Sequence, residues 1–274
     1  MLQDEIITEP KSKPASSLPL PSLPLSTFGS PSEYGDLYAE VMNWDDEQFG
    51  MMTARQEADL KAIIRLPNAA FPPKSRVLEI GFGNGGVLTY GRRRQWEIQG
   101  TEVNELLLQR ARKKGFSAFS AHGNEALDSL ASDFFDLVLA FDVLEHMPAY
   151  EIVGLLRQMR RIAKHGAVFI ARFPNGDSPF SLGVQHGDPT HLTTLGSSKA
   201  SYLAKEAGME IVYLGGEPQP LWSGIPHFCY RIVTNPIRSL LNLCLNLLFY
   251  PGNPKPLCSR NLVMVLRVAK PIAG

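Results

Sequence analysis

The chain has 274 residues, enough to bury the core of one full domain with decorations rather than two equal domains. Its 27 Lys and Arg balance its 27 Asp and Glu, and a formal net charge of zero gives no overall reason to expect a nucleic-acid partner. The three widely spaced cysteines match neither a zinc motif nor a disulfide framework, and they favour a reducing, cytoplasmic compartment.

The N-terminal region differs in composition from the rest of the chain. Residues 1–30 are rich in Pro and Ser, which predicts a disordered tail, and they lack the apolar core segment of a signal peptide. Residues 31–73 carry a helical pattern and are expected to form helices that cap the mouth of the core. The remaining residues, 74–274, are expected to form one domain with an insert at about 216–259.

The most informative segment is 77–86, with the sequence Val-Leu-Glu-Ile-Gly-Phe-Gly-Asn-Gly-Gly. Its apolar start predicts a buried parallel strand, and its glycines predict a tight turn that lets the backbone come close to a ligand. Glu79 adds a carboxylate near the end of this strand, where open α/β sheets bind ligands. The segment therefore predicts a nucleotide-like cofactor site.

Two cofactors fit the glycine pattern. Gly81, Gly83 and Gly86 match the dinucleotide fingerprint G-x-G-x-x-G, and Glu102 follows at a suitable distance for an acid that binds a ribose. The carboxylate of Glu79 would repel a pyrophosphate, whereas S-adenosylmethionine carries a sulfonium cation and no phosphate. We therefore favour S-adenosylmethionine. An NAD-dependent oxidoreductase on a Rossmann fold is the alternative, although the chain has no Tyr-x-x-x-Lys pair.

Strand and helix patterns alternate from residue 76 onward. Apolar runs predict strands at 77–80, 96–103, 116–121, 135–141, 167–173, 210–214 and 261–268. Helical spacing predicts helices at 87–94, 104–114, 151–163 and 197–207. This alternation predicts an α/β fold, with a mainly parallel, doubly wound sheet and helices on both of its faces.

The insert before the last strand contains an apolar helical segment at 235–250. Arg238, Asn242 and Asn246 recur every four residues, which puts one polar stripe on an otherwise apolar helix. The segment is shorter than the roughly 20 residues that span a bilayer. Three environments are open for it: the interface of a membrane, a homodimer contact, or the core of the domain.

These motifs together resemble the class I S-adenosylmethionine-dependent methyltransferases, in the branch that includes ubiquinone-biosynthesis O-methyltransferases and bacterial glycan-cluster enzymes. The resemblance extends over about 76–216, through the glycine segment, Gly-Thr-Glu-Val-Asn at 100–104 and the fourth-strand run that ends in Leu-Glu-His at 144–146. It implies a Rossmann-like sheet of seven strands, in which an antiparallel last strand lies beside the sixth.

The resemblance also implies which residues bind the cofactor. An acid that ends strand two, here Glu102, holds the ribose hydroxyls. Asn124 stands where the family usually carries an aspartate near the adenine, and an amide can serve the adenine edge. Of Asp142 and Glu145, one faces the cofactor and the other is structural. The expected cofactor-binding residues are Glu79, Gly81, Phe82, Gly83, Gly85, Glu102, Val103, Asn124, Asp142 and Val143.

Histidines near the ends of strands four and five are the candidates for catalysis. Methyl transfer to a hydroxyl benefits from a base, and histidine suits that task near neutral pH. The candidates are His146, after the fourth strand, and His186, Asp188 and His191, in the loop after the fifth. A role in shaping the pocket or the loop is the alternative for each. His-x-Asp-x-x-His also has the donor types of a metal site, but no further metal shell accompanies it, and no metal is predicted.

We therefore expect a methyltransferase that uses S-adenosylmethionine to O-methylate a sugar, a glycolipid or another small hydroxyl compound. Its expected partners are a small-molecule or lipid-linked glycan acceptor and no nucleic acid, with a peripheral membrane contact or a homodimer formed through 235–250. The expected location is the cytoplasm, at the inner face of the membrane. The alternatives are the oxidoreductase and a non-catalytic, membrane-peripheral partner.

Overall fold

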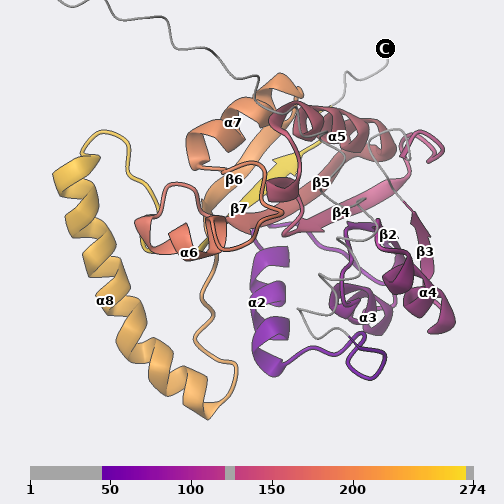
Figure 1. Cartoon of the computed structure of the whole chain (residues 1–274), viewed down its shortest axis with the longest axis horizontal. Helices are drawn as coiled ribbons and strands as arrows, with labels where there is room; N and C mark the ends of the chain where they lie inside the picture. Colours follow the sequence, from indigo (N-terminus) through magenta and orange to yellow (C-terminus); the bar gives the residue numbers. More distant parts are fainter. Residues whose placement is uncertain (1–44, 121–126, 270–274) are drawn as a thin grey trace, which may run out of the picture.

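The computed structural model describes residues 45–120 and 127–269, and Asn124 and the tail at 1–30 lie outside these ranges. Seven strands form one sheet in the order β3-β2-β1-β4-β5-β7-β6 (Figure 1). The strands are β1 (Arg76–Ile80), β2 (Glu97–Glu102), β3 (Ser117–Ser120), β4 (Phe135–Phe141), β5 (Ala163–Pro174), β6 (Glu210–Gly216) and β7 (Asn261–Arg267). The predicted Rossmann-like sheet of seven strands is confirmed.

The direction of the strands follows the expectation from the resemblance. Strands β1 to β5 pair in parallel, whereas β7 lies between β5 and β6 and runs antiparallel to both. In the parallel part, Ile80 pairs with Thr101 of β2 and with Ala140 of β4. The carboxyl ends of these strands therefore meet at one edge, which brings Glu102 and Asp142 to the same place as the glycine turn.

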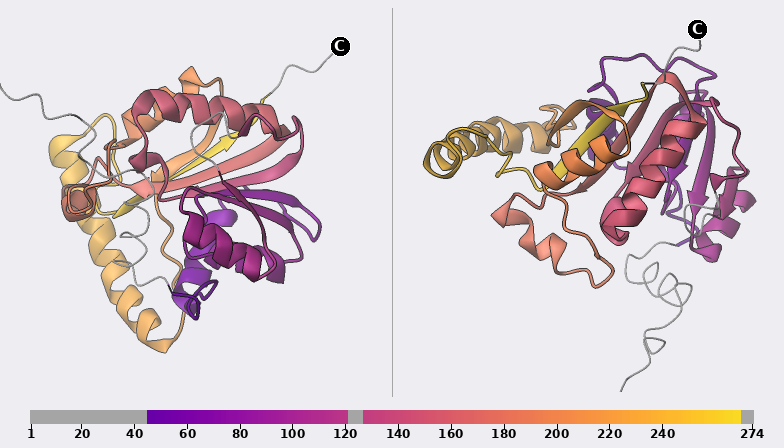
Figure 2. Two further views of the ribbon diagram at one scale, coloured as in Figure 1. Left: turned by 45° about the vertical axis from the view of Figure 1, so that its right-hand side comes forward. Right: turned by 90° about the horizontal axis from the view of Figure 1, so that it is seen from above.

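Helices cover both faces of the sheet (Figures 1 and 2). Side chains such as Leu78 and Val138 join one core with α5 and α7, while Val77 and Leu137 point to the other face and join a core with α2 and α3. This alternation is the two-residue period of a strand that is buried on both faces. The helices are α2 (Ala54–Ile64), α3 (Gly86–Arg93), α4 (Glu105–Lys113), α5 (Ala149–Ile162), α6 (Leu182–Gln185), α7 (Ser197–Glu206) and α8 (Ile225–Phe249).

The expected cap region at 31–73 is described only from residue 45 onward, where α2 is its α-helix. Thr53 caps α2 through a reciprocal capping box with Gln56, which satisfies backbone groups at the helix start. Leu60 and Ile63 bury one side of α2 against the sheet. The division into a tail, a cap region and a main domain stays a prediction.

Helix α8 is longer than the sequence indicated. It runs for 25 residues, whereas the expected helix began near Asn235. Pro236 explains the error, because proline favours the first turn of a helix, yet here it lies inside one. The expectation that the segment is too short for a bilayer was also wrong: by length and composition α8 is long enough to cross one, and 6% of its most apolar window is buried. Figures 1 and 2 show α8 beside the layered body rather than within it.

Candidate active site

The glycine turn after β1 is built from left-handed backbone. Gly81, Gly83 and Gly85 have φ values of 64°, 49° and 68°, a region that side chains with a Cβ rarely adopt. A Cβ on Gly81 would lie 2.7 Å from a methyl carbon of Val143, so Gly81 also lets this turn approach the end of β4. The turn then leads into α3, with Gly85 at its N-cap.

Glu102 is held in place by the backbone around it. One carboxylate oxygen accepts a hydrogen bond from the Gly83 amide at 3.0 Å, and the other accepts from the amides of Val103 at 2.8 Å and Asn104 at 3.2 Å. The carboxylate therefore links the end of β2 to the glycine turn, as a fixed acceptor at the edge of the cofactor site.

Glu79 puts a second acid beside Glu102. Its side chain is buried, and its Oε2 atom has no hydrogen-bond partner within the described residues. Burial, followed by the charge of Glu102, raises the pKa of Glu79 well above its usual range. Glu79 therefore holds its proton until a positive charge is brought next to it.

The two acids distinguish between the two candidate cofactors. A pyrophosphate would put negative charge next to the Glu102 carboxylate, whereas the sulfonium and amino groups of S-adenosylmethionine would be attracted to that carboxylate and would favour ionised Glu79. The residues therefore fit S-adenosylmethionine, which Glu79, Glu102 and the glycine turn would hold.

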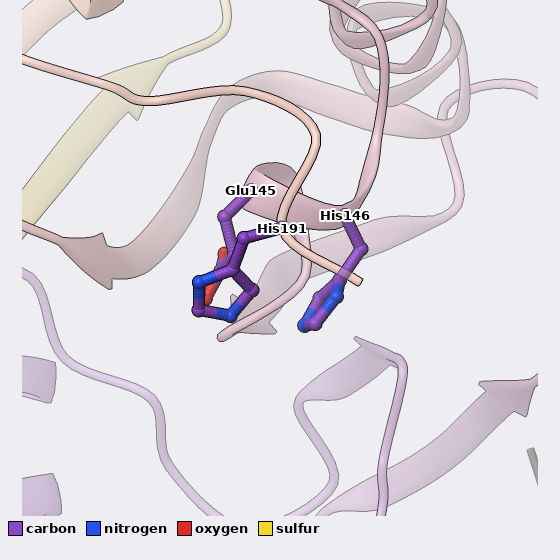
Figure 3. A group of neighbouring side chains, drawn as sticks. All are labelled: Glu145, His146 and His191. Carbon is purple, nitrogen blue, oxygen red and sulfur yellow. The ribbon is translucent and has the colours of Figure 1, made fainter. Parts of the chain in front are cut away.

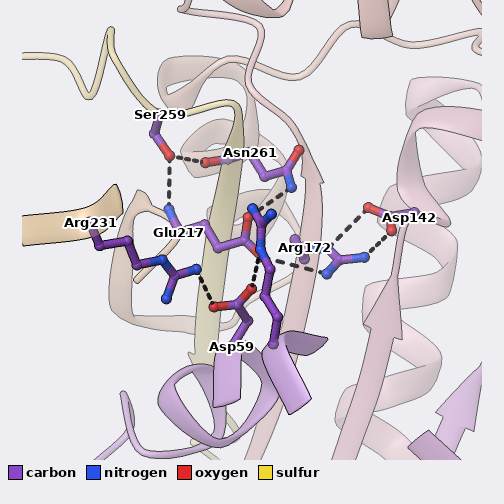
Figure 4. Close-up of polar contacts among 8 residues, drawn as sticks. Asp59, Asp142, Arg172, Glu217, Arg231, Ser259 and Asn261 are labelled. Atoms are coloured by element: carbon purple, nitrogen blue, oxygen red, sulfur yellow. Dashed lines mark hydrogen bonds and ion pairs between the residues drawn. The ribbon is translucent and has the colours of Figure 1, made fainter. Parts of the chain in front are cut away.

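The other expected cofactor residues lie in different surroundings. Val103 is exposed at the edge, while Phe82 is buried in the core and its amide donates to the carbonyl of Thr101. Asp142, at the end of β4, pairs with Arg172 of β5, with 3.2 Å between Nε and Oδ1. Arg172 also reaches Glu217, as Figure 4 shows, so Asp142 belongs to an ion-pair network across the sheet edge.

Glu145, His146 and His191 form a second cluster at the same edge (Figure 3). Glu145 and His146 lie in the short 3₁₀ helix Leu144–His146 after β4, and His191 comes from the loop after α6. The two imidazole rings meet edge to face with 4.8 Å between their centroids. The loop is fixed to this helix by backbone, since the Leu192 and Thr193 amides both donate to the Glu145 carbonyl.

The pKa values in this cluster are shifted in opposite directions. Burial, followed by the charge of Asp142, raises the pKa of Glu145 to about 8, so this carboxyl is largely protonated at neutral pH. Burial, followed by the neighbouring His191, lowers the pKa of His146, so its imidazole is neutral there. A neutral acid beside a neutral base is an arrangement that active sites use for proton transfer.

The tautomer of His146 follows from its hydrogen bonds. Its Nδ1 lies 3.3 Å from the carbonyl oxygen of Thr190 and 2.9 Å from the Thr190 hydroxyl, which itself donates to Asp188 at 2.5 Å. A carbonyl oxygen only accepts, and the hydroxyl proton is used by Asp188, so the ring proton is assigned to Nδ1. The basic nitrogen of the neutral ring is therefore Nε2.

Asp188 supports this arrangement as a carboxylate. Partial burial alone would raise its pKa, but hydrogen bonds from the hydroxyl and amide of Thr190 outweigh burial and lower the pKa. His191 lies 3.7 Å from the same carboxylate. Of the four predicted catalytic residues, the structure brings together His146, Asp188 and His191, whereas His186 is exposed at the end of α6 and does not line the cavity beside them.

Sequence reasoning missed three contributors to this site. It did not place Glu145 with the histidines, and it gave no role to Thr190 or Arg172. Arg172 reaches Asp142 through the pairing of β5 with β4, and Thr190 reaches His146 through the return of a loop to the helix after β4. No local pattern encodes either contact. Within the described part of the chain, the group that could hold a metal ion is Glu145, His146 and His191. Their donor atoms, one from each residue, lie within 4.8 Å of one another.

A cavity of about 1260 Å³ adjoins the cluster. It extends from the end of β4 to α8, which forms its far wall. A site for a methyl acceptor is thus available next to the cofactor edge. Its lining includes Asp59, Asp142, Glu145, His146, Arg172, Asp188, His191, Glu217, Asn235, Arg238, Leu241, Asn242 and Arg260.

Residues 52–214, more than half of the chain, match the sequence model of a family described as "Methyltransferase domain". The chain therefore belongs to this methyltransferase family. The match and the chemistry of the site confirm two predictions: the protein is an enzyme that transfers methyl groups, and S-adenosylmethionine is its cofactor. They overturn both alternatives, the NAD-dependent oxidoreductase and the non-catalytic partner.

Solved structures share the fold at low sequence identity. A SAM-dependent methyltransferase from Archaeoglobus fulgidus is 18% identical with a TM-score of 0.58, over 85% of this chain and 99% of that one. A chain from the complex between the Haloferax volcanii Trm112 methyltransferase activator and a putative methyltransferase is 14% identical with a TM-score of 0.58, over 89% and 100%. Phosphoethanolamine N-methyltransferase 2 of Haemonchus contortus, in complex with S-adenosyl-L-methionine, is 14% identical with a TM-score of 0.54, over 86% and 60%. No curated protein matches the chain significantly.

Proposed function

We propose that this enzyme transfers the methyl group of S-adenosylmethionine to a hydroxyl of a sugar, a glycolipid or a similar small compound. The observation that carries the proposal is His146, a neutral imidazole beside the acceptor cavity whose Nδ1 is held by Thr190. An alcohol loses its proton as it is methylated, so a positioned base has a task in O-methylation. The ubiquinone-biosynthesis and glycan branch suggested by the sequence is part of the same proposal.

The reaction is an in-line displacement. S-Adenosylmethionine supplies a methyl group that its sulfonium has already activated, and holding the two reactants in line contributes much of the acceleration. Nε2 of His146 takes the acceptor proton as the new C–O bond forms and the S–C bond breaks. Asp188 acts through Thr190 to keep the proton on Nδ1 and so keeps Nε2 basic.

Glu145 and Glu79 complete the proposed chemistry. Protonated Glu145 is a hydrogen-bond donor at neutral pH, suited to an acceptor oxygen that enters the cavity. Glu79 and Glu102 stay on the cofactor side, with Gly81 and Gly83 leaving room for close approach.

We infer a cytoplasmic location at the inner face of a membrane, with lipid-linked glycans among the acceptors. The free state of Cys229, Cys244 and Cys258 supports a reducing compartment. The apolar surface of α8, described below, supports the contact with a membrane.

Identification of the atom that receives the methyl group tests this proposal. The enzyme is incubated with S-adenosylmethionine that carries a ¹³C-methyl group and with a panel of sugars, alkyl glycosides and phenols, matched by amines of similar size. We expect a product whose labelled methyl carbon has the chemical shift of an ether. A labelled N-methyl or C-methyl product, with none from the hydroxyl compounds, would contradict O-methylation while leaving the methyltransferase assignment intact.

A further inference from the structure

Helix α8 has the reverse of the usual polarity. Its buried residues are Arg231 and Asn246, whereas most of its large apolar side chains are exposed. A helix of a water-soluble protein normally buries its apolar face and exposes its polar one. The exposed apolar and aromatic residues in and around α8 are Leu221, Trp222, Ile225, Tyr230, Ile232, Val233, Ile237, Leu240, Leu241, Leu243, Leu247, Leu248, Phe249 and Tyr250.

The polar stripe predicted at Arg238, Asn242 and Asn246 faces the body of the protein, and Arg231, which the prediction did not include, extends it. Arg231 pairs with Asp59 of α2 at 2.9 Å, as Figure 4 shows. Asn242 accepts from the Cys258 amide at 3.2 Å, and Asn246 donates to the Lys255 carbonyl at 2.8 Å. Polar contacts therefore fix which side of α8 faces inward, and they leave its apolar side outward.

The inward side of α8 is also a wall of the acceptor cavity. Asn235, Arg238 and Asn242 line this cavity together with His146 and His191 of the catalytic cluster. The apolar surface and the acceptor cavity thus lie on opposite sides of the same helix.

The connections of α8 decide how it can meet a lipid bilayer. The chain enters α8 after β6 and returns from it to β7. These two strands are hydrogen-bonded neighbours, with Gly216 opposite Leu262. The returning segment lies along the polar side of α8, where it is bonded to Asn242 and Asn246. A helix that crosses a bilayer would put its two ends on opposite sides, which this arrangement forbids. The geometry allows α8 to lie flat in the interface.

We propose that the outer face of α8 seats this enzyme on the surface of a lipid bilayer, with the helix lying in the interface between headgroups and acyl chains. The acceptor cavity behind α8 then opens beside the lipid headgroups. This inference adds a docking surface to the proposed methyltransferase and does not depend on which atom receives the methyl group.

Charge and aromatic content favour lipid over a second copy of the chain. The helix has no Asp or Glu, so its outer face carries no carboxylate that would repel the phosphates of a lipid surface. Exposed Trp222 and Tyr250 flank the two ends of α8, and such side chains prefer the boundary between water and hydrocarbon. Because α8 carries few cations, burial of apolar surface is the main driving force.

Flotation with vesicles tests the proposal. The full chain is mixed with vesicles of phosphatidylcholine alone, or of about one part phosphatidylglycerol to three parts phosphatidylcholine. We expect it to float with the lipid. The double variant Leu240→Glu with Leu247→Glu places two charges on the outer face and should reduce vesicle binding about 100-fold. Tyr202→Glu, an equally exposed position on α7, is the matched control and should bind like the unmodified chain.

Two native cysteines report the orientation. Cys229 and Cys244 are exposed on α8, so vesicles should slow their reaction with a water-soluble maleimide in the unmodified chain and not in the double variant. The proposal is overturned if the unmodified chain does not float with either vesicle, or if vesicles leave both thiols equally reactive. It is also overturned if the double variant loses its fold, which would make this face core, or changes a lipid-free dimer into a monomer, which would make it a subunit contact.

Discussion

Glu102→Ala is expected to weaken the binding of S-adenosylmethionine by about 10- to 100-fold, the effect of removing a hydrogen bond to a charged group. The Glu102 carboxylate fixes three amides, among them that of Gly83 in the glycine turn, and it is the proposed acceptor for the ribose hydroxyls. The variant therefore loses both a ligand contact and the support of the turn. Isothermal titration calorimetry measures the change directly.

Glu105→Ala is the control for this loss. Glu105 lies three residues further along, exposed in the first turn of α4, so the variant removes a carboxylate without touching the turn. Its affinity should match that of the unmodified chain. Unchanged affinity in Glu102→Ala, at an unchanged melting temperature, would remove Glu102 from the cofactor site.

His146→Ala is expected to reduce turnover by about 10²- to 10⁴-fold, the usual contribution of a general base. The affinity for S-adenosylmethionine should change little, because His146 lines the acceptor cavity and not the glycine turn. His186→Ala is the matched control, since His186 is exposed outside the cavity and should be dispensable. Initial rates and calorimetry on the same preparations separate the two effects. Full turnover in His146→Ala would leave proximity as the source of catalysis.

The pH profile distinguishes the base from its neighbour. Burial, followed by His191, lowers the pKa of His146, so turnover should fall only at a pH below the ordinary pKa of histidine, about 6.5. In His191→Ala the repelling charge is gone, so the pKa of His146 should rise and the acid limb should move to higher pH. A purely structural role for His191 would lower turnover without moving that limb.

The sheet and the cofactor edge were predictable because local sequence carries their physics. The apolar run before Gly81 has to be buried, and left-handed backbone favours glycine, so the turn could be predicted from the order and spacing of these residues. The strand-end acid Glu102 followed from the rule that ligands bind at the carboxyl ends of parallel strands. Local patterns also placed the seven strands, whereas the order of the strands was implied by the resemblance to class I methyltransferases and not by periodicity.

The acceptor side was predictable only in part. His146, Asp188 and His191 were named from their positions after strands, but their contact depends on a loop that hydrogen-bonds back to Glu145. Burial of Glu145 next to Asp142 is a tertiary effect, and so is the shift of its pKa. The polar stripe of α8 was visible in the sequence, whereas the side of the helix that faces the body was decided by partners such as Asp59, about 170 residues away in the chain.

Calorimetric titration of the unmodified chain with S-adenosylmethionine, and separately with NAD, tests the central claim most directly. Two buried acids beside the glycine turn should accept the cationic cofactor and reject a pyrophosphate. We predict saturable binding of S-adenosylmethionine and no measurable binding of NAD. Saturable binding of NAD without binding of S-adenosylmethionine would contradict the account.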